Sequence, residues 1–177
     1  MSAMSNIVTG LIVLALMLVA VLTWAYVSFA WMDSSVQSWK DMVETSDEAS
    51  RTDIDILDAN STAPYVDVQV HNCGRVHLAS FSDWDVLAQY YLGNGTYQIG
   101  SLSYASAGNL TDNQWNVNTI YSDTGMTQQE VFEPGILNPG EVALFRLRLS
   151  PLPGGNTTNM VAVSTYNGVA TTRQFQG

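Results

Sequence analysis

An uncharged apolar segment near the N-terminus constrains this chain more than any other feature. The segment "IVTGLIVLALMLVAVLTWAYVSFAWM" runs from Ile7 to Met32, and no charged residue precedes Asp33. As an α-helix it would rise about 39 Å at 1.5 Å per residue, which exceeds the roughly 30 Å hydrocarbon layer of a bilayer. Its apolar residues cover every side of the helical wheel, so no polar stripe faces water. The sequence therefore predicts a helix surrounded entirely by lipid or by protein.

The outer end of this helix is rich in aromatic residues. Such residues are typical of a membrane interface, and they also serve as large packing groups between helices. The sequence leaves both interpretations open, and both can hold in succession, first in a membrane and then in an assembly. We expect assembly contacts from one helical row and from these aromatic residues: Ile7, Leu11, Leu14, Leu18, Leu22, Trp24, Tyr26 and Trp31.

The residues before the apolar segment are unusual for a targeting sequence. A secretory signal peptide has a basic start, a shorter apolar core and a small-residue cleavage site, and this arrangement is missing. A membrane anchor is normally oriented by Lys or Arg in its cytoplasmic flank, yet residues 1–6 contain neither. The sequence predicts that a basic leader has been removed or that another factor orients the helix.

The segment "NIVTGLIVLALMLVAVLTWAYVSFAWM", followed by a β-rich remainder, resembles an archaellin, the filament protein of the archaeal-type flagellum, or a closely related type IV pilin-like subunit. Precursors of these families lose a short basic leader. Type IV pilins usually carry glutamate at the fifth position of the mature helix, where this chain has Ser5 if Met1 is the mature terminus, and this difference favours an archaellin. The resemblance implies a helix in the filament core, a β-rich sheath outside, and assembly driven by separate basal machinery with its own ATPase.

Composition excludes one class of partner and points to an exposed particle. The 177 residues carry a net charge of −10, although only 12% of them are charged. Six basic residues leave nucleic-acid binding without an electrostatic footprint. Residues 33–58 hold eight acidic and two basic side chains, a net charge of −6. We interpret this segment as a solvated stretch next to the membrane, with cation or partner binding as the alternative.

The second part of the chain predicts a β-sandwich. All five prolines and twelve of the thirteen glycines follow residue 62. Short β-prone runs alternate there with turn clusters, which is typical of an antiparallel sandwich or barrel. "STYNGVATT" also predicts a hairpin with Asn-Gly in a type I′ turn. The expected strands are residues 64–70, 75–80, 85–92, 96–105, 114–121, 142–150, 159–166 and 169–175.

These patterns predict an α+β protein, with a long N-terminal hydrophobic α-helix followed by an antiparallel, immunoglobulin-like β-sandwich. From Asp33 the helix continues as an amphipathic stretch to about Glu48, because Val36, Trp39 and Val43 keep a helical stripe. We expect an assembly helix over residues 1–50, a neck over 51–59 and an outer sandwich over 60–177.

Candidate chemistry is sparse, and we predict that the chain is not an enzyme and holds no cofactor or metal. No nucleotide-binding, hydrolase or metalloprotease motif occurs in the sequence. His71, Cys73 and His77 could share a strand face, but a structural zinc site needs four ligands, so polar strand ends are the favoured interpretation. Asp83 and Asp85 suggest a surface acid pair rather than a Ca²⁺ loop.

Four Asn-X-Ser/Thr sequons are candidate N-glycosylation sites, at Asn60, Asn94, Asn109 and Asn156. All four fall in predicted loops or turn clusters, and glycans there would shield an exposed surface.

The favoured function is a structural subunit of an extracellular helical filament for motility, present in the membrane before assembly and polymerising with copies of itself. One alternative is a single-span anchored binding or stator protein with the same helix-plus-sandwich plan. Another is an adhesive pilin. A helix that is apolar all round and uncharged at its start favours the filament, whereas the anchor would be expected to have a basic cytoplasmic flank.

Overall fold

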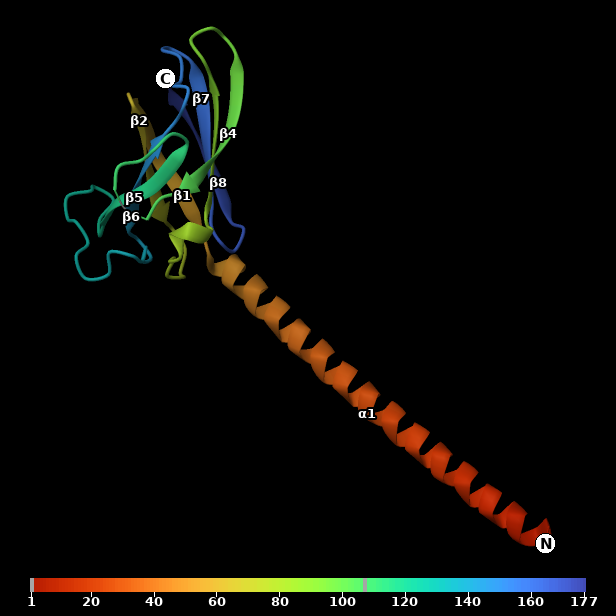
Figure 1. The fold of residues 1–177 in the computed structure, drawn as a ribbon. Coiled ribbons are helices and arrows are strands. Elements are labelled where there is room, and N and C mark those ends of the chain that lie inside the picture. Colours follow the sequence, from red (N-terminus) through yellow and green to blue (C-terminus); the bar gives the residue numbers. More distant parts are fainter. Residues whose placement is uncertain (1, 107) are drawn as a thin grey trace. The chain divides into compact units, whose positions relative to one another are not determined.

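The protein is described here by a computed structural model that covers residues 2–106 and 108–177, with side chains from Ile7 onward (Figure 1). The processing state of Met1 and the side chain of Ser5 therefore lie outside the described residues. The chain divides into two compact units, one ending at Ser46 and the other starting at Asp47. Each unit is described by itself below.

The first element is the helix α1, Ser2–Arg51, drawn from red to gold in Figure 1. Leu, Ala and Met are strong helix formers, and Gly10 is the only glycine and no proline occurs within the helix. At 1.5 Å per residue its 50 residues rise about 75 Å. The helix runs three residues beyond the predicted end at Glu48. Thr52 follows it, and its hydroxyl donates to the Glu48 carbonyl over 2.9 Å.

Eight strands and one short 3₁₀-helix follow α1. Seven of the eight predicted strands are confirmed with small changes at their ends. The elements are β1 (Ile54–Thr62), β2 (Tyr65–Asn72), η1 (Phe81–Asp83), β3 (Asp85–Tyr91), β4 (Tyr97–Tyr104), β5 (Gln114–Tyr121), β6 (Val142–Arg148), β7 (Thr158–Ser164) and β8 (Ala170–Gln176).

One predicted strand is wrong and one strand was missed. Residues 75–80 form a loop in which Leu78 makes an isolated bridge to Leu137, a residue of the loop between β5 and β6. The missed strand is β1, where buried Ile54 and Ile56 alternate with exposed Asp55. Acidic residues in this segment led to the prediction of a solvated neck over residues 51–59. Most of that predicted neck belongs to β1. The division into an assembly helix and an outer domain remains a prediction.

The strands form two four-stranded sheets. One has the order β1-β2-β6-β5 and the other β4-β3-β7-β8. A short parallel contact between β5 and β4 joins the two into one continuous eight-stranded order. That contact involves only Ser103 with Gln114 and Tyr104 with Trp115, and all other strand pairs are antiparallel. β1 and β8 also lie side by side. The predicted α+β class, with a helix before an antiparallel sandwich, is confirmed.

Aromatic side chains fill the space between the two sheets. Phe145 on β6 lies 4.8 Å from Trp115 and 5.7 Å from Trp84 between ring centroids. Phe81 in η1 packs against both Trp84 and Phe145, so the sequence "FSDWD" inserts two rings into the core. Burial of such large rings is the main source of stability for a domain without disulfides.

The hairpin predicted at "STYNGVATT" is confirmed, but its turn is not type I′. Ser164 of β7 pairs with Ala170 of β8, and the Gly168 amide donates to the Thr165 carbonyl. Among the turn residues only Gly168 has positive φ, at 85°, whereas type I′ also needs positive φ at Asn167. The loop between Thr165 and Val169 has three residues instead of the expected two. Gly168, the last of the three, is the left-handed residue that follows the turn.

Candidate functional site

The apolar part of α1 is exposed on every side. Its side chains from Ile7 to Met32 contact no other part of the described chain closely enough to be buried, and its most apolar window has a mean hydropathy of 2.6 with no buried residue. This helix is long and apolar enough to cross a membrane. Exposure of the side chains expected to carry assembly ranges from 54% at Leu18 to 77% at Tyr26: Ile7, Leu11, Leu14, Leu18, Leu22, Trp24, Tyr26 and Trp31.

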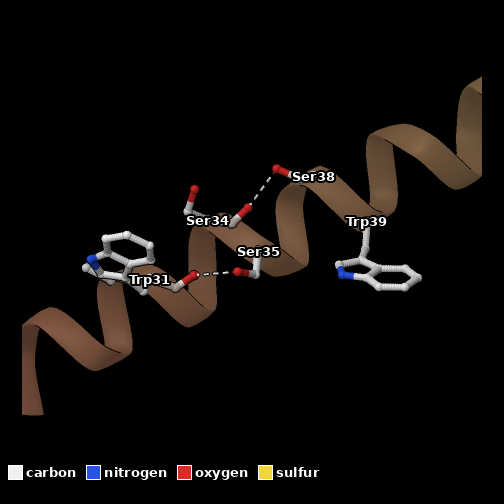
Figure 2. Close-up of a pocket in the computed structure, with 6 residues that line it drawn as sticks. Trp31, Ser34, Ser35, Ser38 and Trp39 are labelled. Atoms are coloured by element: carbon white, nitrogen blue, oxygen red, sulfur yellow. Dashed lines mark hydrogen bonds between the residues drawn. The ribbon is translucent and has the colours of Figure 1, made fainter.

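Several hydroxyl side chains on the helix donate to carbonyls of the helix itself. Thr23 donates to the carbonyls of Val19 and Ala20, and Ser35 donates to the carbonyl of Trp31 (Figure 2). A hydroxyl that donates to the carbonyl one turn back does not expose an unpaired donor to apolar surroundings. These polar residues are therefore compatible with a lipid or protein environment.

Small side chains separate two indole rings where the apolar segment gives way to charge. Ser34, Ser35 and Ser38 lie between Trp31 and Trp39, whose rings both project from the helix (Figure 2). Small residues on a helix allow a neighbouring helix to approach closely, and large rings at either side add contact area. The arrangement suits helix packing, which is one of the two interpretations of Trp31.

The last helical turn belongs to the second unit and is tied to the sandwich, a region we call the junction. The Tyr166 hydroxyl donates to the Glu48 carboxylate, and the Asn167 amide donates to the Thr52 hydroxyl over 2.6 Å. Arg75 donates its amide to the Arg51 carbonyl over 2.9 Å. The carbonyl groups and side chains at the helix end are therefore held by β-sandwich loops.

Gly74 makes this junction possible. Its amide donates to the Asp53 carbonyl over 2.9 Å. A Cβ atom at this position would lie 2.5 Å from the Asp53 nitrogen, so no other residue fits without a shift of the backbone. The turn that carries Gly74 is fixed by buried Asn72, whose amide donates to the carbonyls of Val76 and Leu137.

The surroundings of Tyr166 in the junction change the pKa of its hydroxyl. Burial, followed by the hydrogen bond to Glu48 and its negative charge, raises the pKa of Tyr166 to about 12. All three causes disfavour the phenolate. Tyr166 therefore stays a hydrogen-bond donor throughout the neutral pH range.

The histidines and the cysteine are not brought together as one group. His71 Nδ1 lies 3.1 Å from Cys73 Sγ, while His77 Nδ1 lies 2.6 Å from Asn138 Oδ1 in a different loop. Partial burial, with Asp53 and Asp55 nearby, raises the pKa of the Cys73 thiol. Residues 2–106 and 108–177 contain no group of three or more His, Cys, Asp or Glu placed to hold a metal ion.

Asp83 and Asp85 both lie on the surface, on either side of buried Trp84. Asp83 ends η1 and Asp85 begins β3, so the chain changes conformation between them. Trp84 turns inward and donates its indole N–H to the Ala79 carbonyl over 3.1 Å. The contribution of Asp83, Trp84 and Asp85 that the structure shows is therefore the packing of Trp84 in the core.

The four sequon asparagines are all exposed. Asn94, Asn109 and Asn156 lie in loops as expected, but Asn60 lies within β1. Asn60 lines the same surface hollow as Gly177, and the Asn156 amide donates to the Gly177 carbonyl. Asn60 and Asn156 therefore lie near the C-terminus, at the far end of β1 from the junction.

Comparisons with known proteins identify likenesses in sequence and in fold. No family model matches the chain. The chain is 27% identical over 173 residues to an uncharacterized protein of Archaeoglobus fulgidus, covering 96% of this chain and 94% of that one.

Two solved structures share its fold. The first is the archaellum periplasmic stator protein FlaG of Sulfolobus acidocaldarius, with a TM-score of 0.50, 22% identity, and coverage of 70% of this chain and 99% of that chain. The second is the archaeal flagellum of Methanospirillum hungatei, with a TM-score of 0.57, 11% identity, and coverage of 96% of this chain and 92% of that chain. The fold of this chain is therefore one that archaellum components use.

Proposed function

We propose that this chain is a non-enzymatic structural component of an archaellum, with its helix in apolar surroundings and its β-sandwich outside the cytoplasm. One observation carries the proposal. An exposed apolar helix is joined in a single chain to a sandwich whose fold occurs in an archaellum stator protein and in an archaeal flagellum.

The exposed helix supports an assembled or membrane-bound state. Burying apolar surface is worth about 25 cal/mol per Å², so each leucine left in water costs roughly 2 kcal/mol. Between Ile7 and Met32 these costs add up to far more than the stability of an ordinary domain. Lipid and a bundle of helices are almost equally apolar, so transfer between them costs little, and helix contacts decide which is occupied.

The first candidate role is a filament subunit, with helices of many copies in the core and sandwiches in the sheath. The likeness to the flagellum of Methanospirillum hungatei supports it, because that likeness covers both the helix and the sandwich of this chain. In this role the four sequons would carry glycans on the outer surface.

The second candidate role is a stator-like protein held in the membrane by α1. The likeness to FlaG supports it, because the match covers 99% of that chain at twice the identity of the filament likeness. The aromatic residues Trp24, Tyr26 and Trp31 would then mark a membrane interface just before the first charge at Asp33.

Cell fractionation separates the two roles. Cells that produce the chain are sheared, sheared filaments are pelleted, and the chain is quantified in the pellet and in washed membranes by mass spectrometry. A filament subunit will be a major component of the pellet, and its N-terminal peptide will show the residue left by leader cleavage. A stator-like protein will remain in the membranes.

Deletion of the gene tests the proposal that the chain is an archaellum component, whichever of the two roles it has. Loss of swimming with unchanged surface attachment is expected for an archaellum component in either role. Unchanged swimming with lost attachment would contradict the proposal and identify an adhesive pilin instead. Complementation with the intact chain serves as the control.

A further inference from the structure

The sheet β4-β3-β7-β8 is almost free of charge. In that order its four strands contain 8, 7, 7 and 7 residues, 29 in all, and only Asp85 and Arg173 are charged. The whole of residues 86–111, which includes most of β3 and all of β4, has no charged residue. For a protein with a net charge of −10 this is an unusual surface.

The outer face of this sheet carries exposed apolar side chains where β3 and β4 lie side by side. Ile99 on β4 is 61% exposed, and Tyr97 is 48% exposed. The Tyr97 ring lies 5.1 Å from the ring of Tyr91 on β3, and its hydroxyl donates to Gln89 over 2.9 Å. These residues form an ordered patch that the sandwich itself does not cover.

The same part of β4 has an open backbone edge. β4 pairs with β3 from Tyr97 to Leu102, and its pairing with β5 is limited to Ser103 and Tyr104. The Leu92 amide donates to the Thr96 carbonyl, so these two residues form a hydrogen-bonded pair. Because hydrogen-bonded pairs alternate with non-bonded pairs along an antiparallel ladder, the backbone groups of Gln98, Gly100 and Leu102 point toward β3. The amides and carbonyls of Tyr97, Ile99 and Ser101 therefore point away from β3 and have no backbone partner within residues 2–106 and 108–177.

This edge lacks the features that normally prevent strand addition. Natural edge strands are protected by charged residues, prolines or β-bulges. β4 reads "YQIGSLSY", without charge or proline, and its pairing with β3 has no register shift. An edge with this composition is a template for another strand.

We propose that the edge of β4 pairs with β4 of a second copy of this chain, antiparallel and centred on Ile99. Ile99 of each copy then lies opposite Ile99 of the other, and Tyr97 lies opposite Ser101. Each of these positions exchanges backbone hydrogen bonds across the new pair. The outer faces of the two copies join, so that the exposed side chains of Tyr97 and Ile99 gain neighbours on both sides.

Charge favours contact between two copies at this edge over contact between them at other surfaces of the sandwich. Copies with a net charge of −10 repel each other wherever acidic residues meet. Contact between two uncharged edges avoids this repulsion, and like charges directly opposite in a strand pair would destabilise it. Because residues 86–111 carry no charge, two sandwiches can approach each other at the β4 edge with little electrostatic cost.

The inference adds to the proposed function without depending on it. Pairing of identical edges forms a two-fold contact that ends at two copies, whereas a helical filament repeats a head-to-tail contact. The pairing therefore fits the stator-like role directly, and in a filament subunit it would be confined to the membrane form before assembly.

Cysteine cross-linking of the full chain in detergent tests the geometry. Ile99→Cys in a Cys73→Ser background places two thiols opposite each other, with Cα atoms about 5.5 Å apart, within the range of a disulfide. Leu87→Cys in the same background is the matched control, because the two β3 strands are separated by about three strand spacings, or roughly 14 Å. We expect disulfide dimers from the first variant and few from the second. Dimers from the control alone would overturn the pairing and indicate face-to-face stacking.

Hydrogen exchange gives a second, independent measurement. Amides of Tyr97, Ile99 and Ser101 should exchange rapidly in dilute protein and at least about tenfold more slowly when the chain is concentrated, which corresponds to 1.4 kcal/mol or more. Amides of Gln98, Gly100 and Leu102 should stay protected at all concentrations. Exchange at the first three that is independent of concentration would overturn the proposal.

A charge variant completes the test. Ile99→Lys places two like charges together at the centre of the pair and should abolish the concentration-dependent protection of Tyr97 and Ser101. Val131→Lys is the control, since Val131 is an exposed apolar residue (70%) in the loop between β5 and β6, away from β4 in the sequence. Equal behaviour of the two variants would contradict the pairing. Cell fractionation reports on the archaellum role separately, so failure of one proposal leaves the other intact.

Discussion

The helix and the sandwich solve the burial of apolar side chains in opposite ways. Between Ile7 and Met32 the helix leaves its side chains at least half exposed almost everywhere, whereas Phe145 and Trp115 in the sandwich are completely buried. The sandwich therefore has its own core, and the helix needs surroundings from other molecules. The comparison teaches that one truncation should have different consequences in the two units.

The largest expected effect is the loss of a core ring. Phe145→Ala removes the ring that contacts Phe81, Trp84 and Trp115, and should destabilise the sandwich by about 3–5 kcal/mol. Leu18→Ala is the matched truncation in the helix and should leave the sandwich within about 0.5 kcal/mol of its original stability. Urea unfolding in detergent, followed by hydrogen exchange of amides in the strands, measures both. Equal losses of stability in the two variants would show that the sandwich core depends on the apolar helix.

A charge in the middle of the helix should have the next largest effect, on insertion rather than on the sandwich. Leu18→Arg places a guanidinium near the centre of the apolar segment, at a cost of about 2.5–3.5 kcal/mol for membrane insertion. The chain should be depleted from washed membranes and from sheared filaments. Thr45→Arg, on the charged part of α1, serves as the control. Normal membrane recovery of Leu18→Arg would contradict an apolar environment for this helix.

The smallest expected effect concerns the junction. Tyr166→Phe removes the hydroxyl that donates to Glu48 and should destabilise the sandwich by about 0.5–1.5 kcal/mol at pH 7. Because the folded state raises the pKa of Tyr166 from 10.0 to about 12, the contribution is complete below pH 10 and is lost as pH rises toward 12. Stability of the original chain and the variant should converge over that interval. A constant difference from pH 7 to pH 12 would exclude the proposed role of the hydroxyl.

The sequence predicted the parts of the fold that depend on local pattern. The apolar helix follows from its composition. β6 follows from alternation, since Phe145 and Leu147 are buried whereas Leu144, Arg146 and Arg148 are partly exposed. β1 was missed because Asp55 and Asp58 carry the acidic signal of a neck, although Ile54 and Ile56 alternate with Asp55. In this strand burial on one face outweighs the low strand preference of Asp.

The candidate sites were less predictable because they depend on contacts between distant residues. Glu48 and Tyr166 are separated by 118 positions, and neither residue is distinctive in its local sequence. The close approach of Gly74 to Asp53 is visible only in three dimensions. The charge-free run from 86 to 111 was the available signal for the β4 edge, whereas its open hydrogen-bonding groups depend on the short contact with β5.

The junction has a mechanical consequence. Only Thr52 and Asp53 separate α1 from β1, and backbone or side-chain hydrogen bonds hold both residues to loops of the sandwich. A pull or a twist that reaches the last helical turn is thus shared among the strand that follows, the turn at Gly74 and the β7–β8 hairpin. Load spread over parallel attachments resists tearing better than load on a single loose tether, so the last helical turn should stay attached to the sandwich under tension.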